Sequence, residues 1–167
     1  MRKMLVTAAL LTALGTSATA MAAPVNNMAN NETAIGAGTK EMYVEHKFTK
    51  NLTAGYQYAD RDEYNKQNDI YAQYDLVGSN VKAVAGWRNK LPGDKSNVYG
   101  GLAVVSPSVM GFEAYASYVK GADFGETQVG INKNLVANVD LNVNYHNFAP
   151  DNGHHETGVG AGITVKF

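Results

Sequence analysis

The sequence predicts an all-β protein, and three observations carry that prediction. Short segments with apolar side chains at every second position recur through residues 31–167. A period of two is typical of strands, because successive strand side chains point to opposite faces. Turn-forming residues separate these segments, and helical periodicity appears only near the N-terminus. With 167 residues, a single domain is expected.

The first 22 residues have the layout of a secretory signal peptide. Met1-Arg2-Lys3 precedes an apolar run from Met4 to Leu14, and Ala20-Met21-Ala22 forms a small-residue cleavage site. The apolar run is shorter than the roughly 20 residues that a spanning helix needs. We therefore expect residues 1–22 to be removed on export, and the polar residues 23–30 to be a flexible lead-in to one domain over 31–167.

Eight alternating segments follow from Leu52 onward. The clearest is Ala137–His146, in which five apolar positions interleave with five polar ones. Residues 96–105 are apolar on both faces, so the sequence leaves their facing undecided. The eight segments are Leu52–Ala59, Ile70–Val77, Val81–Arg88, Ser96–Val105, Phe112–Val119, Thr127–Asn132, Ala137–His146 and Glu156–Phe167.

Two more strands are predicted at the front of the chain. Glu41–Phe48 reads as a ninth strand, and closed bacterial barrels usually have an even number. Asn31–Thr39 is the candidate partner, joined by a turn near Gly38–Lys40. Its E-T-A-I-G-A-G echoes E-T-G-V-G-A-G of the last segment, so the two glycine-spaced strands could pair and close the barrel. The echo could also be a coincidence of common small residues. We predict ten strands, with eight strands plus an N-terminal extension as the alternative.

The connections between these segments alternate in character. Tight turns are expected at Gly78–Asn80, Lys133–Asn134 and Ser106–Gly111. Longer, more charged connections alternate with these tight turns. Outer-membrane barrels show the same asymmetry, with short turns on the periplasmic side and longer loops on the external side. If Phe167 lies at the periplasmic end, this parity holds along the whole chain. The longer connections are Asp60–Asn68, Asn89–Lys95, Gly121–Gly125 and Ala149–His155.

The last strand resembles that of small bacterial outer-membrane β-barrel proteins of the porin-like kind. One face carries Val159, Ile163 and Val165, and the chain ends on Phe167. The resemblance implies a transmembrane up-and-down antiparallel β-barrel in the bacterial outer membrane. It also implies that the barrel-insertion machinery recognises this strand, with Val159, Ile163, Val165 and Phe167 as its signal residues.

Alternation alone does not say which face of the barrel points outward. A soluble lipocalin-like barrel would turn the apolar faces inward. The membrane interpretation is favoured because Gly55, Gly86 and Gly130 share faces with polar residues, which suits a crowded polar interior. Aromatic residues such as Trp87 and Tyr145 fall near segment ends, where interfacial girdles lie.

Charges of both signs are predicted in the lumen. They could form the constriction of a narrow water-filled pore, or ion pairs that plug it. Small barrels have interiors that side chains largely fill, and open channels belong to about sixteen strands or more. The sequence thus favours a narrow or filled lumen. The predicted lumen charges are Asp75, Lys82, Arg88, Glu113, Asp140 and Lys166.

Composition excludes several other classes. Removing Arg2 and Lys3 with the leader takes the formal net charge from −1 to −3, which gives no basic patch for nucleic acid. The absence of cysteine excludes disulfides and thiolate metal sites. His154-His155 is interpreted as a polar loop tip, since adjacent strand residues point opposite ways. We expect no enzymatic activity, cofactor or metal, and a monomer whose partners are outer-membrane lipid and the insertion machinery. An adhesin acting through external loops is the alternative function.

Overall fold

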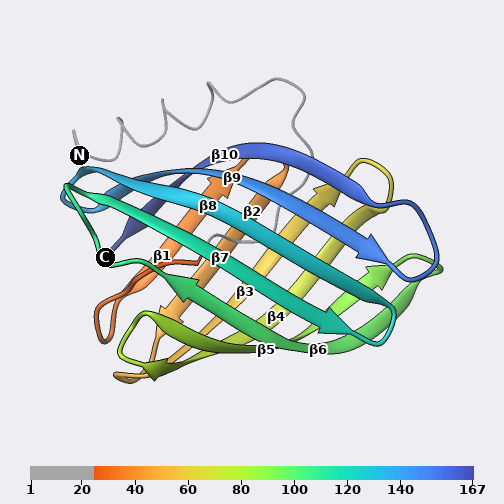
Figure 1. Cartoon of the computed structure of the whole chain (residues 1–167), viewed down its shortest axis with the longest axis horizontal. Coiled ribbons are helices and arrows are strands. Elements are labelled where there is room, and N and C mark those ends of the chain that lie inside the picture. Colours follow the sequence, from red (N-terminus) through yellow and green to blue (C-terminus); the bar gives the residue numbers. More distant parts are fainter. Residues whose placement is uncertain (1–24) are drawn as a thin grey trace.

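The computed structural model describes residues 25–167, so the predicted signal peptide lies outside the described part. These residues form ten strands (Figure 1). Among residues 25–167 there is no helix long and apolar enough to cross a membrane. The strands are β1 Thr33–Gly38, β2 Glu41–Lys47, β3 Leu52–Arg61, β4 Asn65–Val77, β5 Val81–Leu91, β6 Lys95–Val105, β7 Phe112–Gly121, β8 Phe124–Val136, β9 Val139–Pro150 and β10 Glu156–Lys166.

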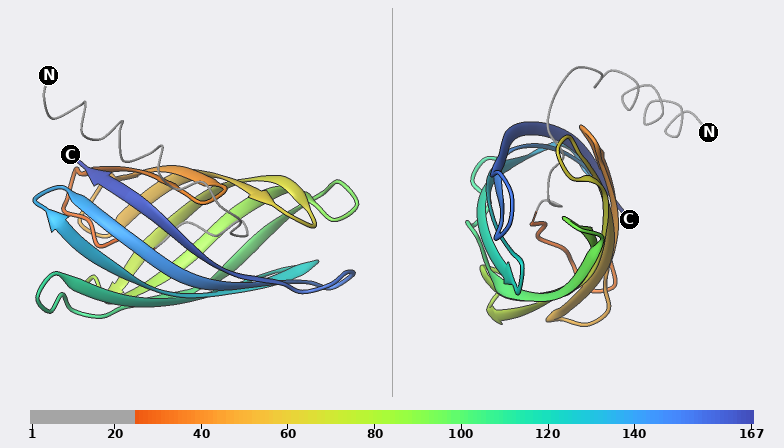
Figure 2. Two further views of the ribbon diagram at one scale, coloured as in Figure 1. Left: turned by 90° about the horizontal axis from the view of Figure 1, so that it is seen from above. Right: turned by 90° about the vertical axis from the view of Figure 1, so that its right-hand side faces the viewer.

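The ten strands form a closed antiparallel barrel. Each strand pairs with the next along the chain, and β1 pairs with β10 to complete the ring (Figure 2). Up-and-down closure of this kind leaves every strand with a neighbour on both sides. The prediction of about ten strands is confirmed, including the two strands before Thr49.

The predicted seam is also confirmed. Ile35 is the register partner of Val165, and Gly38 is that of Gly162. A Cβ atom placed on Gly162 would lie 3.1 Å from the Cα of Gly38, so the small residues allow this close approach. Because β1 has only six residues, the seam ladder ends at the Gly38–Gly162 pair.

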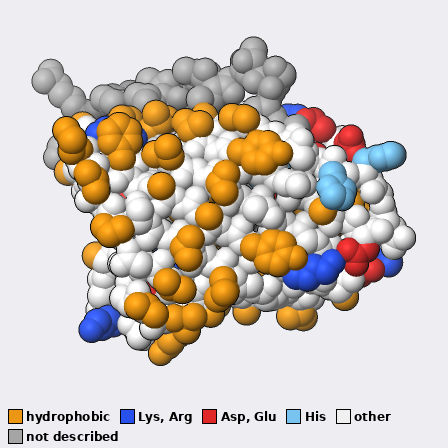
Figure 3. All heavy atoms as spheres, in the orientation of Figure 1, with side chains coloured by type: hydrophobic (Ala, Val, Ile, Leu, Met, Phe, Trp, Pro, Cys, Tyr) orange, Lys and Arg blue, Asp and Glu red, His pale blue; other side chains and the backbone are white. Residues whose placement is uncertain are grey.

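Polar side chains fill the inside of the barrel and apolar ones cover the outside. Figure 3 shows hydrophobic side chains spread over the wall, with most of the visible charged and histidine side chains gathered at one end. This arrangement is that of a barrel that spans a membrane, and it reverses the soluble barrel. Exposed on the outer face are Ile35, Met42, Val44, Tyr56, Ile70, Tyr74, Leu76, Trp87, Val98, Leu102, Val104, Tyr118, Val129, Ile131, Val143, Tyr145 and Val159.

The structure shows which face of β6 points into the barrel, a question that the sequence left open. Tyr99, Ala103 and Val105 are buried in the interior, whereas Val98 and Leu102 are exposed on the outside. β6 is apolar on both faces because its inward side chains pack against other apolar groups inside the barrel.

The predicted connections were partly wrong. The β8–β9 turn is Ala137-Asn138, because Lys133 and Asn134 remain in the ladder opposite Leu141 and Asp140. The four connections expected to be long are shorter, because the strands continue into them. They shrink to residues 62–64, 92–94, 122–123 and 151–155. We call the end that carries them the loop end, and the end that carries Phe167 the terminal end.

The lead-in enters the barrel. Val25, Asn26 and Met28 are buried, with 3 %, 2 % and 7 % of their surfaces exposed. Residues 25–28, which we call the plug segment, belong to no strand and lie inside the ring of strands (Figure 2). No pattern within this polar stretch indicates that it is held inside the barrel.

Candidate functional site

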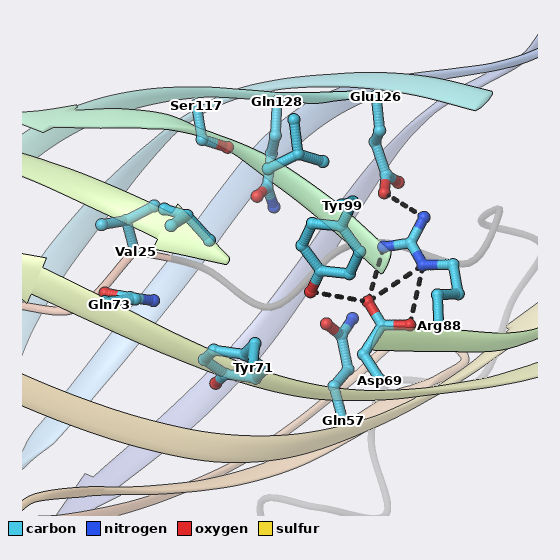
Figure 4. Close-up of a pocket in the computed structure, with 12 residues that line it drawn as sticks. Val25, Gln57, Asp69, Tyr71, Gln73, Arg88, Tyr99, Ser117, Glu126 and Gln128 are labelled. Atoms are coloured by element: carbon cyan, nitrogen blue, oxygen red, sulfur yellow. Dashed lines mark hydrogen bonds and ion pairs between the residues drawn. The ribbon is translucent and has the colours of Figure 1, made fainter. Parts of the chain in front are cut away.

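The loop-end half of the interior is built around Arg88. Its guanidinium binds Asp69 on the neighbouring strand through two donors, Nε to Oδ1 at 2.7 Å and Nη2 to Oδ2 at 2.6 Å. Nη1 lies 2.6 Å from Oε2 of Glu126 across the lumen. Tyr99 donates its hydroxyl to Asp69 at 3.3 Å (Figure 4). A bidentate pair of this kind fixes the guanidinium in place as well as neutralising it.

A second arginine completes this layer. Arg61 Nη2 donates to Oε1 of Glu126 at 2.5 Å, and its Nε donates to Gln67 at 2.7 Å. The guanidinium lies 4.2 Å from the ring centroid of Phe148, and that of Arg88 lies 4.6 Å from the centroid of Phe124. Aromatic faces attract cations, so each phenylalanine stabilises the guanidinium that it faces. Charged and aromatic side chains thus cross the lumen at this level.

The terminal-end half holds a second charged group. Asp75 accepts hydrogen bonds from Lys47 at 2.7 Å and from Lys82 at 2.6 Å. All three side chains are at most 5 % exposed. Buried charges are tolerated when they are paired and hydrogen-bonded in this way.

The plug segment is held by side chains from several strands. Asn26 Nδ2 donates to Oε1 of Glu45 at 2.7 Å and to the hydroxyl of Tyr43 at 3.1 Å. Asn132 Nδ2 donates to the carbonyl of Val25 at 3.1 Å. The side chain of Val25 packs in an apolar cluster with Ala103, Val105 and Tyr115. Side chains from strands β2, β6, β7 and β8 thus hold the plug segment in place.

A third charged group lies near the terminal end. Lys166 Nζ is 2.8 Å from Oδ2 of Asp140 and donates to the carbonyl of Asn27 at 2.9 Å. Asn27 in turn donates to Glu113 at 3.5 Å. A shallow pocket of about 200 Å³ opens here, and it includes Glu113, Asp140 and Lys166 in its lining.

Little empty space remains between these groups. A cavity of about 50 Å³ lies between the two halves, lined among others by Val25, Tyr71, Arg88 and Gln128 (Figure 4). A polar cavity of this size has room for water molecules that bridge the surrounding side chains. The interior is therefore a packed polar core.

All six charges assigned to the lumen from the sequence lie on the inward face. Asp75, Lys82 and Arg88 are at most 5 % exposed, and the other three are gathered near the terminal end. Several equally buried charged residues were not predicted from the sequence. Three of them, Glu41, Glu45 and Lys47, stand at alternating positions of E-M-Y-V-E-H-K, and this spacing places them on one face of the strand. The missed residues are Glu41, Glu45, Lys47, Arg61, Asp69, Glu126 and Glu156.

The predicted insertion signal lies on the outer face of β10. Val159 and Phe167 are 60 % and 65 % exposed, and Val165 is half-buried. Ile163 pairs with Ala37 and Leu141 on the same face but is only 8 % exposed. His154 and His155 lie in the loop between β9 and β10. Within residues 25–167 no group of three metal-binding side chains is arranged to hold an ion.

Similarity to known proteins is found among solved structures. No family model matches the chain, and no curated protein matches it. Among solved structures, the N-terminal barrel of Pseudomonas aeruginosa OprF aligns over 83 % of this chain and 98 % of that one, with 9 % identity and a TM-score of 0.44. A de novo designed transmembrane barrel aligns over 84 % and 98 %, with 14 % identity and a TM-score of 0.42. Neisserial surface protein A aligns over 81 % and 94 %, with 15 % identity and a TM-score of 0.33.

Proposed function

We propose that the chain is a bacterial outer-membrane barrel with a closed lumen, acting as a structural membrane protein and passing at most very small ions. The observation that carries the proposal is the packed interior. The Arg61–Glu126–Arg88–Asp69 chain crosses the loop-end half. In the terminal-end half, the plug segment is held inside the lumen by Glu45, Asn132 and Lys166.

The charges inside the barrel support a filled lumen rather than a selective pore. A conducting constriction needs charged groups that face water and that ions can approach and leave. Here Arg88 and Asp69 are 3 % and 4 % exposed and are bound to each other. An ion entering this layer would have to displace an existing ion pair.

The alternative function, adhesion through external loops, has less support. The connections at the loop end are residues 62–64, 92–94, 122–123 and 151–155. Binding surfaces of stable complexes need about 800 Å² from each partner. Tight turns of this length offer little contact area beyond the rim of the barrel.

Two measurements on the purified full-length mature protein test the proposal. In liposome-swelling assays we expect no uptake of a pentose, and in planar bilayers no large steady conductance. A gel in which the unheated protein migrates differently from the boiled one serves as the folding control. Pentose uptake by protein that passes this control would overturn the closed lumen.

A further inference from the structure

The strands hold the plug segment as a binding site holds an extended peptide. The segment belongs to no strand, so side chains rather than a strand ladder fix its main chain. Asn132 donates to the carbonyl of Val25 at 3.1 Å, and Lys166 donates to that of Asn27 at 2.9 Å. Peptide-binding sites combine hydrogen bonds to the main chain with pockets that select individual side chains. The lumen supplies the first of these two elements.

The second element is a set of groups that select the side chain of Asn26. Its Nδ2 donates to Oε1 of Glu45 at 2.7 Å and to the hydroxyl of Tyr43 at 3.1 Å. Glu45 is only 2 % exposed, so its carboxylate faces protein donors rather than bulk water. An aspartate in place of Asn26 would lose the donor and bring a second carboxylate to Glu45. The adjacent Val25 packs in the apolar cluster that contains Tyr115, so the site also favours an aliphatic residue there.

The plug segment has a way out of the lumen. The turn Ala29–Glu32 joins it to β1 at the terminal end, where Glu32 N–H donates to the carbonyl of Ala29 at 3.3 Å. Removal of the predicted leader after Ala22 leaves two residues before Val25. Because the segment belongs to no strand, it can leave through the terminal end while the ring of ten strands stays intact.

The plug segment also separates two cavities. Val25 lines the central cavity together with Ser117 (Figure 4). Asn27 contacts Lys166, which lines the pocket at the terminal end. Without the segment, the two spaces would join into one polar vestibule. The ion pairs of Glu126 would still close this vestibule toward the loop end.

We propose that the terminal-end half of the lumen is a binding site for an uncharged, extended peptide, and that the plug segment is its resident ligand. The required peptide presents an aliphatic residue followed by asparagine, with main-chain carbonyls on the aliphatic residue and on the residue after the asparagine. The occupant is residues 23–30 of this chain, A-P-V-N-N-M-A-N, which carry no charged side chain. The proposal rests on the proposed function for the closed loop-end half of the lumen.

The reaction of a single thiol measures whether the site opens. The chain has no cysteine, so Ser117→Cys gives one thiol in the central cavity. In the mature protein we expect a water-soluble methanethiosulfonate to react slowly with this thiol. A variant without residues 23–30 should react at least about tenfold faster, because the reagent no longer waits for the segment to leave. The synthetic peptide A-P-V-N-N-M-A-N should slow the reaction of this variant to the rate of the mature protein.

Two altered peptides test whether the recognition is specific. Asn26→Asp removes the donor to Glu45, and Asn30→Asp adds the same charge at an exposed position. We expect the first peptide to bind at least about tenfold more weakly than the unaltered one, since hydrogen bonds to charged groups are among the strongest. The second should bind as well as the unaltered peptide. A truncated variant that reacts no faster than the mature protein would overturn the proposal. Absence of protection by the unaltered peptide, or equal protection by the two altered ones, would do the same.

The same two substitutions in the full-length mature protein test the site without truncation. With Ser117→Cys present, Asn26→Asp should raise the rate of thiol reaction at least about tenfold, and Asn30→Asp should leave it unchanged. Equal rates in the two variants would contradict the proposal, even where the truncated variant does not fold. The heat-dependent gel shift checks folding in each case. Pentose uptake by the unaltered protein measures the closed lumen separately, so a failure of either proposal is distinguishable from a failure of the other.

Discussion

The ring of Tyr71 lies over Gly55, its cross-strand partner in the β3–β4 ladder. A Cβ atom on Gly55 would be 2.6 Å from Cζ of the ring and 2.9 Å from Cβ of Glu45. The ring cannot move away freely, because it is buried and its hydroxyl donates to Glu45 at 3.0 Å. Large and small residues thus interlock across neighbouring strands. The same contact recurs at Tyr43 with Gly36, Tyr99 with Gly86 and Tyr115 with Gly130.

Gly55→Ala is therefore expected to destabilise the barrel by about 1–3 kcal/mol, the usual cost of overpacking. Gly100→Ala is the matched control, because a Cβ there points outward and meets its nearest atom at 3.8 Å. Urea unfolding in lipid vesicles measures both. Equal stabilities of the two variants would show that the tyrosine–glycine contact does not constrain the interior.

Asp75→Asn should cost about 3–5 kcal/mol, because it leaves Lys47 and Lys82 buried beside each other without their counter-charge. Asp151→Asn breaks the exposed pair with Lys120 at the loop end and should cost at most about 1 kcal/mol. The same unfolding assay compares them. A small loss at Asp75 would mean that water reaches this half of the lumen.

The outward position of Val143 gives a test of the lipid-facing wall. Val143→Arg should cost about 2–4 kcal/mol if the side chain faces the middle of the bilayer. Thr157→Arg, on the outer face of β10 near the loop end, should cost about 0–1 kcal/mol. The unfolding free energies of the two variants in vesicles should therefore differ clearly. Equal costs would contradict the depth assigned to Val143.

Asp123, in the β7–β8 turn, gives a prediction about pH. Its pKa lies below the ordinary 3.8, first because Asn97 donates a hydrogen bond to the carboxylate and then because Lys95 does so. A lowered pKa means that the stabilisation is present above the ordinary value and is lost as the pH falls through the lowered one. Carboxyl carbon NMR should give a midpoint below 3.8, and Asn97→Ala should raise it. A native midpoint at or above 3.8 would refute the contact.

The alternation of apolar and polar side chains made most of this fold predictable. The predictions were wrong or incomplete where no such alternation marks the structure. The parity counted back from Phe167 required a strand before Glu41, and β1 occupies that place. By contrast, the plug segment has no periodicity, and its position depends on partners such as Glu45 and Asn132 on distant strands. No local pattern marks such contacts. Turn positions were misplaced for a related reason, since asparagine and lysine can continue a strand when the ladder supports them.

The single tryptophan offers the most direct test of the inside-out barrel. Trp87 lies on the outer face of β5 between Ile70 and Val98, and 41 % of its surface is exposed. With the protein in vesicles, brominated phosphatidylcholine should quench its fluorescence strongly, and aqueous iodide should quench it little. Strong quenching by iodide with none by the brominated lipid would contradict a barrel whose apolar face meets the membrane.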